Sequence, residues 1–377
     1  MAATMITQIL ERASQGEEIS PQEGYLLLTA SYPPEWLQQA ADELRRNLVG
    51  EAVSYVVNRN INFTNICEQH CGFCAFRRDE NQPGSYWLTS EDLVAKVEDA
   101  LRRGATEICL QGGLHPQAQR QGSTLNYYLE LVTTIKTTAP TIHLHAFSPQ
   151  EIQFISRQDG ISISDVLKEL QKAGVDSLPG TAAEVLDDRI RRLICPEKID
   201  TATWLSIVTQ AHRMGIPTTS TMLCGQLEAA EHQIRHLQAL RELQKRTGGL
   251  TEFILLPFVG AQAPVWLRRR VGREQPDLGA TLKLTAVARL FLGRWVRHHQ
   301  PSWVKLGLAG AVQALQWGCD DIGGTLMEEH ITTMAGATGG TGKTVAELQQ
   351  AIQSVGRPYW QRTTLYRPCQ EVPELVA

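Results

Sequence analysis

Three closely spaced cysteines, Cys67, Cys71 and Cys74, are the residues of this sequence best suited to do chemistry. Their spacing is C-x3-C-x2-C, and an aromatic residue, Phe73, directly precedes the last of them. Proteins that hold a 4Fe–4S cluster usually supply four cysteines. Three thiolates can hold the same cluster and leave one iron open to a further ligand, which turns an electron carrier into a catalyst. We therefore predict a cluster with three cysteine ligands and one open iron.

A zinc site is the alternative interpretation of these cysteines. Zinc sites usually pair cysteines as C-x2-C and take a fourth Cys or His from elsewhere in the chain. His70 lies between two of the cysteines and would be cramped as that ligand. The remaining cysteines have no paired spacing, as expected for a protein of a reducing compartment. The spacing therefore favours the cluster over zinc.

Length and charge limit the function classes. The 377 residues suit an α/β barrel, which often runs longer than other single domains. The net charge of −4 gives no overall field that would attract nucleic acid or an anionic membrane. The first residues lack the basic and apolar regions of a signal peptide, and no apolar run is long enough to span a membrane. We expect a soluble, cytoplasmic protein with no nucleic-acid and no membrane partner.

The elements that position the cysteines alternate from about residue 58 onward. Short apolar segments are each followed by an amphipathic helical pattern, such as 91–103 after Ser90 and 201–214 before Gly215. This alternation predicts a parallel sheet, and eight such units predict a (β/α)8 barrel of the TIM type. A six-unit partial barrel, with the last segments packed as an extension, is the alternative. The strand candidates are 60–63, 107–110, 141–145, 176–178, 218–223, 253–256, 303–306 and 320–322.

Three regions follow from this reading. Residues 1–57 are expected to form a helical extension, in which Ser20-Pro21-Gln22-Glu23 has the pattern of a capping box. Residues 58–330 are expected to form the barrel core. Residues 331–377, with a last helix at 345–355, are expected to close the barrel.

Candidate binding residues follow the predicted strands, because active sites of such barrels lie at the C-terminal ends of the strands. Gln111-Gly112-Gly113 follows the second strand, and its glycines would let the backbone approach a ligand closely, unless they only form a turn. Ser148 follows the third strand, and Glu184 follows the fourth. Thr181-x-x-Glu184 also fits a capping box, so the carboxylate of Glu184 either starts a helix or reaches a ligand.

Two histidines, His143 and His145, lie in the third strand candidate. We expect one of them to face the barrel interior and the other to face the helices. His145 is nearer the mouth and is our candidate for a substrate contact. His115, in the loop after the second strand, is a further candidate, and each of these histidines has a purely structural reading as well.

Two further motifs are set aside. Ala337–Thr344 is similar to a phosphate-binding loop, but alanine occupies the place of its first glycine and no apolar strand precedes it. Arg268–Arg270 is a short basic run without interleaved aromatic residues. We expect a solvated loop there, or a minor surface for docking a partner.

The cysteine spacing, followed by the Gly112-Gly113 segment, resembles the signature of the radical S-adenosylmethionine (SAM) superfamily. The likeness extends over nearly the whole chain, from Asn60–Asn65 to Gln361–Tyr366. The segment Ser177-Leu-Pro-Gly-Thr-Ala-Ala-Glu184 resembles most the tyrosine-using FO synthase family (subunit 2) of deazaflavin biosynthesis. Its relatives in the futalosine route to menaquinone are expected to have a more glycine-rich version.

The resemblance implies a set of ligands and of residues that bind them. Cys67, Cys71 and Cys74 would hold a 4Fe–4S cluster whose open iron chelates the methionine part of S-adenosyl-L-methionine. Leu114 stands where the superfamily often has Glu, so a backbone carbonyl would take over the contact with the amino group. Gln226 stands where we expect His and would substitute as a hydrogen-bonding group. The implied cofactor-binding residues are Phe73, Gln111, Gly112, Gly113, Ser148 and Glu184, and the candidate catalytic residues are His145 and Glu184.

The resemblance also implies a reaction. An external one-electron reductant would start SAM cleavage, the Cα–Cβ bond of L-tyrosine would break, and the 4-hydroxybenzyl fragment would add to 5-amino-6-(D-ribitylamino)uracil. The product would pass to the other radical SAM subunit of FO synthase. Candidate hydrogen-bonding groups for the substrates are Gln111, Ser148, Asp176, Ser177, Thr181 and Glu252.

Three alternatives to this function stay open. A radical SAM enzyme of the menaquinone (futalosine) pathway would have the same cluster and another acceptor. A non-catalytic protein would keep a metal cluster for structure or for sensing. An RNA-modifying enzyme would need a basic face, which the sequence does not show.

Overall fold

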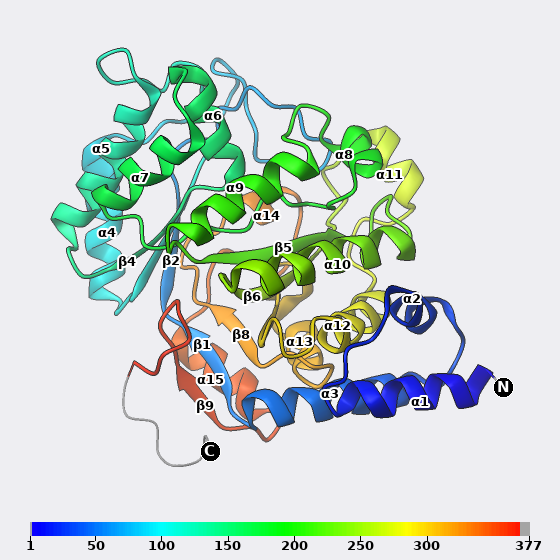
Figure 1. Ribbon diagram of the computed structural model, residues 1–377. Coiled ribbons are helices and arrows are strands. Elements are labelled where there is room, and N and C mark those ends of the chain that lie inside the picture. The colour runs from blue at the N-terminus through cyan, green and yellow to red at the C-terminus, as the bar shows by residue number, and fades with distance from the viewer. Residues whose placement is uncertain (1, 370–377) are drawn as a thin grey trace.

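The computed structural model describes residues 2–369, in which helices surround a barrel of parallel strands (Figure 1). The strands are β1 (Val53–Val56), β2 (Asn58–Asn62), β3 (Glu107–Gln111), β4 (His143–Ala146), β5 (Thr218–Cys224), β6 (Leu250–Pro257), β7 (His298–Pro301), β8 (Asp321–Gly324) and β9 (Tyr359–Gln361). The helices are α1 (Ala2–Ser14), α2 (Pro21–Thr29), α3 (Pro34–Val49), α4 (Ser90–Arg102), α5 (Thr124–Thr138), α6 (Pro149–Asp159), α7 (Ile163–Ala173), α8 (Asp188–Ile194), α9 (Thr201–Arg213), α10 (Ala230–Thr247), α11 (Val265–Val271), α12 (Leu278–Leu292), α13 (Trp303–Leu315), α14 (Ile331–Met334) and α15 (Val345–Gln353).

The barrel is closed, with β1 and β2 together forming its first strand. β1 pairs with β8, β2 pairs with β3, and the ladders β3–β4 and β5–β6–β7 are also parallel. Ser177 and Leu178 fill the position between β4 and β5 by single bridges. A backbone hydrogen bond of 3.1 Å, donated by Asp320 to His299, joins the segment before β8 to β7. The (β/α)8 barrel is therefore confirmed, and the partial barrel is not the fold of this chain.

Two strand predictions are wrong. Residues 303–306 begin α13, and the seventh strand is β7, the four residues His298–Pro301 just before it. β7 has none of the β-branched residues that mark a strand in sequence, because its side chains meet polar groups: His298 Nδ1 lies 2.7 Å from Asp320 Oδ2. Residues 176–178 form only the isolated bridges described above.

The N-terminal helices α1–α3 pack along α10 and α12 on the outside of the barrel (Figure 1). Ser20 caps α2 in a complete capping box with Glu23, as predicted. Residues 53–56, predicted to be helical, instead form β1 because they complete the barrel between β8 and β9. Within residues 2–369 no helix has both the length and the hydrophobicity needed to cross a membrane.

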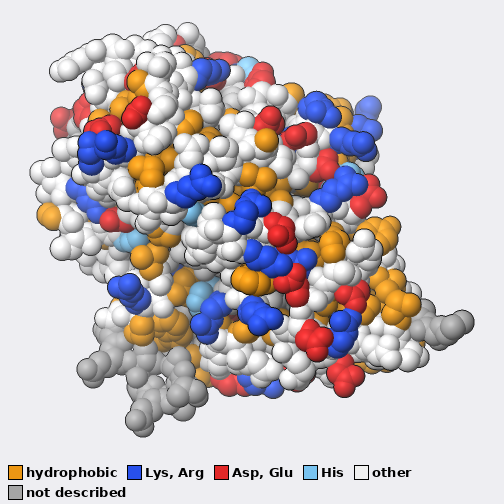
Figure 2. Space-filling view, viewed as in Figure 1, with side chains coloured by type: hydrophobic (Ala, Val, Ile, Leu, Met, Phe, Trp, Pro, Cys, Tyr) orange, Lys and Arg blue, Asp and Glu red, His pale blue; other side chains and the backbone are white. Residues whose placement is uncertain are grey.

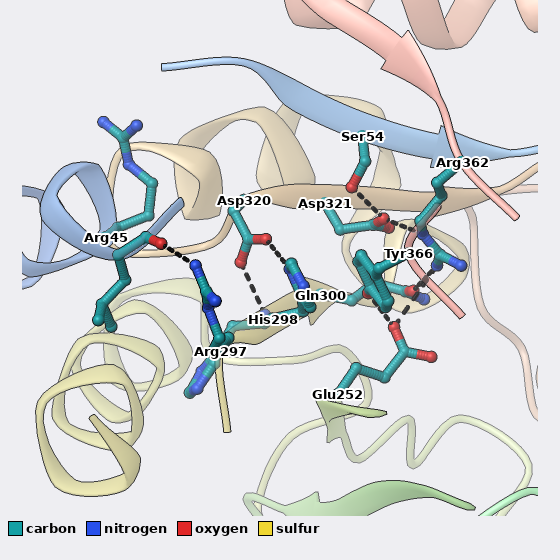
Figure 3. A network of polar contacts seen from close by, with 12 residues as sticks. Arg45, Ser54, Glu252, Arg297, His298, Gln300, Asp320, Asp321, Arg362 and Tyr366 are labelled. Carbon is teal, nitrogen blue, oxygen red and sulfur yellow. Dashed lines mark hydrogen bonds and ion pairs between the residues drawn. The ribbon is translucent and has the colours of Figure 1, made fainter. Parts of the chain in front are cut away.

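The chain returns under the barrel after α15. β9 pairs with β1, and the residues that follow reach the carboxylates at the N-terminal ends of the strands (Figure 3). Arg362 forms ion pairs with Asp321 and Glu252, and the Tyr366 hydroxyl donates to Glu252. The Tyr366 ring stacks on His298 with centroids 3.6 Å apart. These contacts seal the barrel at the end opposite the cysteine loop.

Candidate active site

The cysteine loop leaves the C-terminal end of β2 and is held at its base by Asn65. The side chain of Asn65 donates to Gly84 O at 2.8 Å and accepts from Tyr86 N at 2.9 Å. Cys67 N also donates to Arg78 O at 3.2 Å. Both ends of the loop are thus fastened to each other, so that the three cysteines extend over the barrel mouth.

The three thiols differ in their surroundings. Burial raises the pKa of Cys67 and of Cys71, and the ammonium of Lys198 opposes the rise at Cys71. Among residues 2–369 no group of three or more His, Cys, Asp or Glu side chains converges on a point where one metal ion would bind. That observation concerns a site for one metal ion. It does not bear on a cluster, in which each of the three thiolates would bind a different iron atom.

Gly112 and Gly113 lie directly under the cysteine loop because they have no side chains. A Cβ on Gly113 would overlap the carbonyl of Ile66 and lie 3.1 Å from Cys67 Cβ, and a Cβ on Gly112 would meet the Phe63 ring. Gly113 N donates to Thr64 O at 2.8 Å, and Leu114 O accepts from Glu68 N at 2.9 Å. The sequence predicts a close approach of this backbone to a ligand. In the structure, the glycines allow a close approach to the backbone of the cysteine loop.

Glu151 holds this glycine segment and is a residue that the sequence reasoning missed. Its carboxylate accepts from Gly112 N at 3.1 Å and from Ser148 N and Oγ at 2.7 and 2.8 Å. Burial raises the pKa of Glu151 to about 7, although these hydrogen bonds oppose the rise. Ser148, proposed as a cofactor ligand, is the N-cap of α6, and its capping box with Glu151 was a readable signal.

Glu184 does not start a helix, so its capping-box reading is wrong. Its Oε1 accepts from Lys198 Nζ at 2.7 Å, with the two side chains 10% and 15% exposed. The Lys198 ammonium also lies 5.5 Å from the centre of the Phe73 ring in the cysteine loop. In the described part of the chain, Oε2 of Glu184 has no hydrogen-bond partner. Lys198 thus links Glu184 to the cysteine loop.

Backbone strain gathers at the same end of the barrel. Phe147, Ala182, Glu184, Leu326 and Met327 have positive φ angles of 68°, 62°, 45°, 54° and 53°. Each of them follows a strand position at the C-terminal face. Such conformations are costly for residues other than glycine and tend to be kept at functional sites.

His143 and His145 both face the barrel interior, so the prediction of opposite sides is wrong. His143 Nε2 and His145 Nδ1 each lie 2.7 Å from Ser177 Oγ. Residues two apart in a strand point to the same face, which the prediction overlooked. Burial lowers the pKa of His145 to about 4, which keeps its imidazole neutral, while the charge of Glu107 opposes the shift.

The remaining candidate residues fall into different parts of the structure. Thr181 donates to Gln111 Oε1 at 3.0 Å, so these two candidates lie together at the mouth. Asp176 is exposed and pairs with Lys136 at 2.7 Å. Glu252 belongs to the seal at the opposite end (Figure 3).

Two predicted polar residues have buried atoms without partners. His115 accepts from Gln117 N through Nδ1 and packs on Trp87, and its Nε2 has no partner among the described residues. Both amide atoms of Gln226 are buried without a hydrogen bond in the same described part. An amide in this condition is ready to bind a ligand that brings its own polar groups.

The two motifs set aside also have structural explanations. In the glycine-rich segment, Gly339 N donates to Val304 O, and the Lys343 ammonium lies 5.4 Å from the Trp303 ring centre. Arg268–Arg270 form the last turn of α11, so the prediction of a loop is wrong there.

Comparisons with known proteins agree with this arrangement. The family model of the radical SAM superfamily matches residues 61–240, and that of the CofH/MqnC C-terminal region matches residues 247–375. A protein of Cyanothece sp. named 5-amino-6-(D-ribitylamino)uracil–L-tyrosine 4-hydroxyphenyl transferase is 63% identical over 370 residues, which cover 96% of this chain and 97% of that protein. A protein of Trichormus variabilis with the same name is 61% identical over 97% of this chain and 96% of its own length.

Solved structures share the fold at low sequence identity. Methylornithine synthase (PylB) superposes with a TM-score of 0.72 at 17% identity, covering 93% of this chain and 97% of that one. The FeFe-hydrogenase maturase HydG from Carboxydothermus hydrogenoformans reaches 0.71 at 16% identity, covering 96% and 80%. The chain therefore belongs to the radical SAM superfamily and, within it, to the family of the 5-amino-6-(D-ribitylamino)uracil–L-tyrosine 4-hydroxyphenyl transferases.

Proposed function

We propose that this chain cleaves the side chain of L-tyrosine and transfers the 4-hydroxybenzyl fragment to 5-amino-6-(D-ribitylamino)uracil, a step of deazaflavin (FO) biosynthesis. The observation that carries the proposal is the meeting of three elements at one barrel mouth. These are the three-cysteine loop, the Gly112-Gly113 backbone without side chains, and the Glu184 carboxylate. In the described part of the chain, one oxygen of that carboxylate binds Lys198 and the other has no hydrogen-bond partner. The relatives at 57–63% identity bear the name of this reaction.

The donor set fits an iron–sulfur cluster. Cys67, Cys71 and Cys74 would bind a 4Fe–4S cluster as its three protein ligands, and the fourth iron would take S-adenosyl-L-methionine. When bound, this pair supplies the 5′-deoxyadenosyl radical. Soft thiolates suit iron–sulfur clusters. The two other side chains in the Cys-x3-Cys-x2-Cys segment that could bind a metal are engaged elsewhere, since Glu68 pairs with Arg157 and His70 turns toward Glu197 and Arg77.

We assign the cofactor contacts to groups beside the cysteine loop. Phe73 would pack against the nucleoside side of the site, and Gln111, Gly112 and Gly113 would face the methionine side. Ser148 would act through Glu151, which fixes the glycine segment. The Oε2 atom of Glu184 would accept from a hydroxyl or an amine.

The barrel interior would hold the substrates away from water. The seal formed by Arg362, Tyr366, Glu252 and Asp321 closes its floor, and a reactive radical needs such exclusion from solvent. His145 uses Nδ1 for Ser177, so Nε2 would be the atom that meets a substrate. Because its imidazole is neutral, His145 would donate or accept one hydrogen bond without adding charge.

Partners and regions complete the proposal. An external one-electron reductant would serve the cluster, and the other radical SAM subunit of FO synthase would receive the product. Residues 58–330 would act as the catalytic core together with β1, with the helices before β1 as an extension and 331–377 as the closing segment. Residues 370–377 of that segment lie outside the described residues.

The test is an anaerobic reaction of reconstituted protein. Dithionite, SAM, L-tyrosine and 5-amino-6-(D-ribitylamino)uracil are added, and mass spectrometry follows 5′-deoxyadenosine and a hydroxybenzyl–uracil adduct. We expect both products, with neither from C71A. C319A is the matched control, because Cys319 is buried among apolar residues away from the loop, and it should keep both products.

Other outcomes point to the alternatives. 5′-Deoxyadenosine without the adduct would move the acceptor toward that of the menaquinone relatives. Neither product from protein with an intact cluster would refute the enzyme assignment and favour a structural or sensing role.

A further inference from the structure

The outer side of the cysteine loop borders a cavity of about 690 Å³. Cys71 and Cys74 line it from the loop, Leu193 lines it from α8, and Trp266 lines it from α11. A Cβ on Gly72 would lie 3.2 Å from the Trp266 ring, so α11 touches the loop directly. Two of the three proposed cluster ligands therefore lie just behind a hollow of the outer surface.

The rim of this cavity is unusually apolar for a surface. Leu193, Val265 and Trp266 are 48%, 52% and 43% exposed. Large apolar side chains exposed side by side, with polar neighbours around them, are typical of protein interaction sites. Trp266 is also of the residue type most often found at the energetic centre of an interface.

The same rim carries positive charge. Arg269 and Arg270 lie three and four positions after Trp266 on α11, and Arg189 lies four positions before Leu193 on α8, so each shares a helix face with an exposed apolar residue. Within residues 2–369 these three exposed arginines form no ion pair. Figure 2 shows basic side chains over α8 and α11 at the upper right.

The acidic groups nearby do not cancel this charge. Asp79 is paired with Arg77, and Glu197 is engaged by His70. At the start of α8, Asp187 pairs with Arg235, and the charge of Asp188 is matched by the exposed Arg192 of the same helix. The whole chain has a net charge of −4, so a basic rim here runs against its overall balance. A basic rim around an apolar hollow is complementary to an acidic protein with an apolar centre.

We propose that a small acidic iron–sulfur electron carrier docks on this rim, formed by α8, α11 and the cysteine loop, and reduces the cluster from its outer side. The inference rests on the proposed function, in which one electron supplied to the cluster starts SAM cleavage. One electron leaves the reduced carrier, which is oxidised, and enters the cluster, which is reduced by one electron. Iron–sulfur carriers transfer single electrons at low potential, which matches this need.

The test compares two charge-reversal variants of the reconstituted protein. R269E/R270E reverses the rim. R213E/R246E is the matched control, since Arg213 and Arg246 are also exposed last-turn arginines without an ion pair within residues 2–369, on α9 and α10. Stopped-flow absorbance measures cluster reduction by a reduced acidic 2Fe–2S ferredoxin at low and at high salt, and by dithionite.

We expect the ferredoxin-dependent rate of R269E/R270E to fall about tenfold or more at low salt, because the rim steers association, and to approach the wild-type rate at high salt. The control should change less than about twofold, as should reduction of both variants by dithionite. W266S should slow the ferredoxin reaction at both salt levels, because it removes the apolar contact and no charge.

Three results would overturn the inference. The first is a wild-type rate of reduction by ferredoxin in R269E/R270E, and the second is an equal loss of that rate in R213E/R246E. The third is a loss of rate seen only when an acidic flavoprotein replaces the ferredoxin. Failure of the proposed function looks different. In that case dithionite reduces the cluster, but no adduct forms in any variant.

Discussion

The buried ion pair between Glu184 and Lys198 gives the sharpest prediction about the candidate site. Lys198→Met keeps the length of the side chain and removes its charge. The Nζ–Oε1 distance is 2.7 Å, which corresponds to an attraction of about 6 kcal/mol at an effective dielectric constant near 20. The lost contact with the Phe73 ring adds roughly 1 kcal/mol.

The variant leaves the Glu184 carboxylate buried without its counter-charge. Breaking a buried pair in this way costs about 3–5 kcal/mol of unfolding free energy, less than the bare attraction because desolvation offsets part of it. Glu184→Gln should also destabilise the protein. The double variant should lose much less than the sum of the two, with a coupling of about 2 kcal/mol or more.

Urea unfolding of the four apoproteins, followed by circular dichroism, measures this cycle. R157A is a matched control, because it removes one partner of an exposed ion pair with Glu68 and should cost less than about 1 kcal/mol. A loss below about 1 kcal/mol in K198M, or additive losses in the double variant, would refute the reasoning that the pair is buried and coupled.

The remaining predictions concern the glycine segment, its carboxylate and the seal. Gly113→Ala should displace the Cys67 end of the loop and lower the iron content after reconstitution. Gly279→Ala should not, because its Cβ would have only an ordinary contact, 3.6 Å from Asp277 Oδ1. As the pH rises from 4.5 to 7, the unfolding free energy of wild-type apoprotein should fall by about 3 kcal/mol relative to that of Glu151→Gln, as measured in urea. The reason is that a carboxyl whose pKa is raised in the folded state disfavours folding as it ionises. Parallel curves of unfolding free energy against pH would contradict this. Arg362→Met should lower the unfolding free energy by about 3–5 kcal/mol, because it leaves the buried carboxylates of Asp321 and Glu252 without their counter-charge. A thermal melting curve like that of the wild type would argue against the seal.

The sequence predicted the architecture well where local pattern and packing agree. The alternation of apolar strands with capped helices gave the barrel, and the capping box at Ser20 appears as expected. β7 was missed because the partners of its His298 side chain, Asp320 just before β8 and Tyr366 of the C-terminal segment, lie far away in the sequence. The helix start at 303–306 was misread for a different reason, because its buried apolar residues look like those of a core strand.

The candidate site was predictable only in part. The cysteine spacing and the glycine pair are local signals and could be read directly. Lys198 lies fourteen positions after Glu184 and on the other side of α8, so only the folded chain shows that they pair. The error over His143 and His145 was of another kind, because the period of a strand was applied wrongly.

The pairing of β1 has a consequence for how the chain folds as it is made. β1 is the first strand to leave the ribosome, yet its two neighbours are β8 and β9, and Val53 pairs with Tyr359. An unfinished chain therefore exposes both edges of β1, and exposed strand edges invite association with other chains. Until the final segment emerges, the edges of β1 need protection from outside the chain, so we expect the nascent protein to depend on chaperones. We also expect slow closure of the barrel to limit the yield of folded protein.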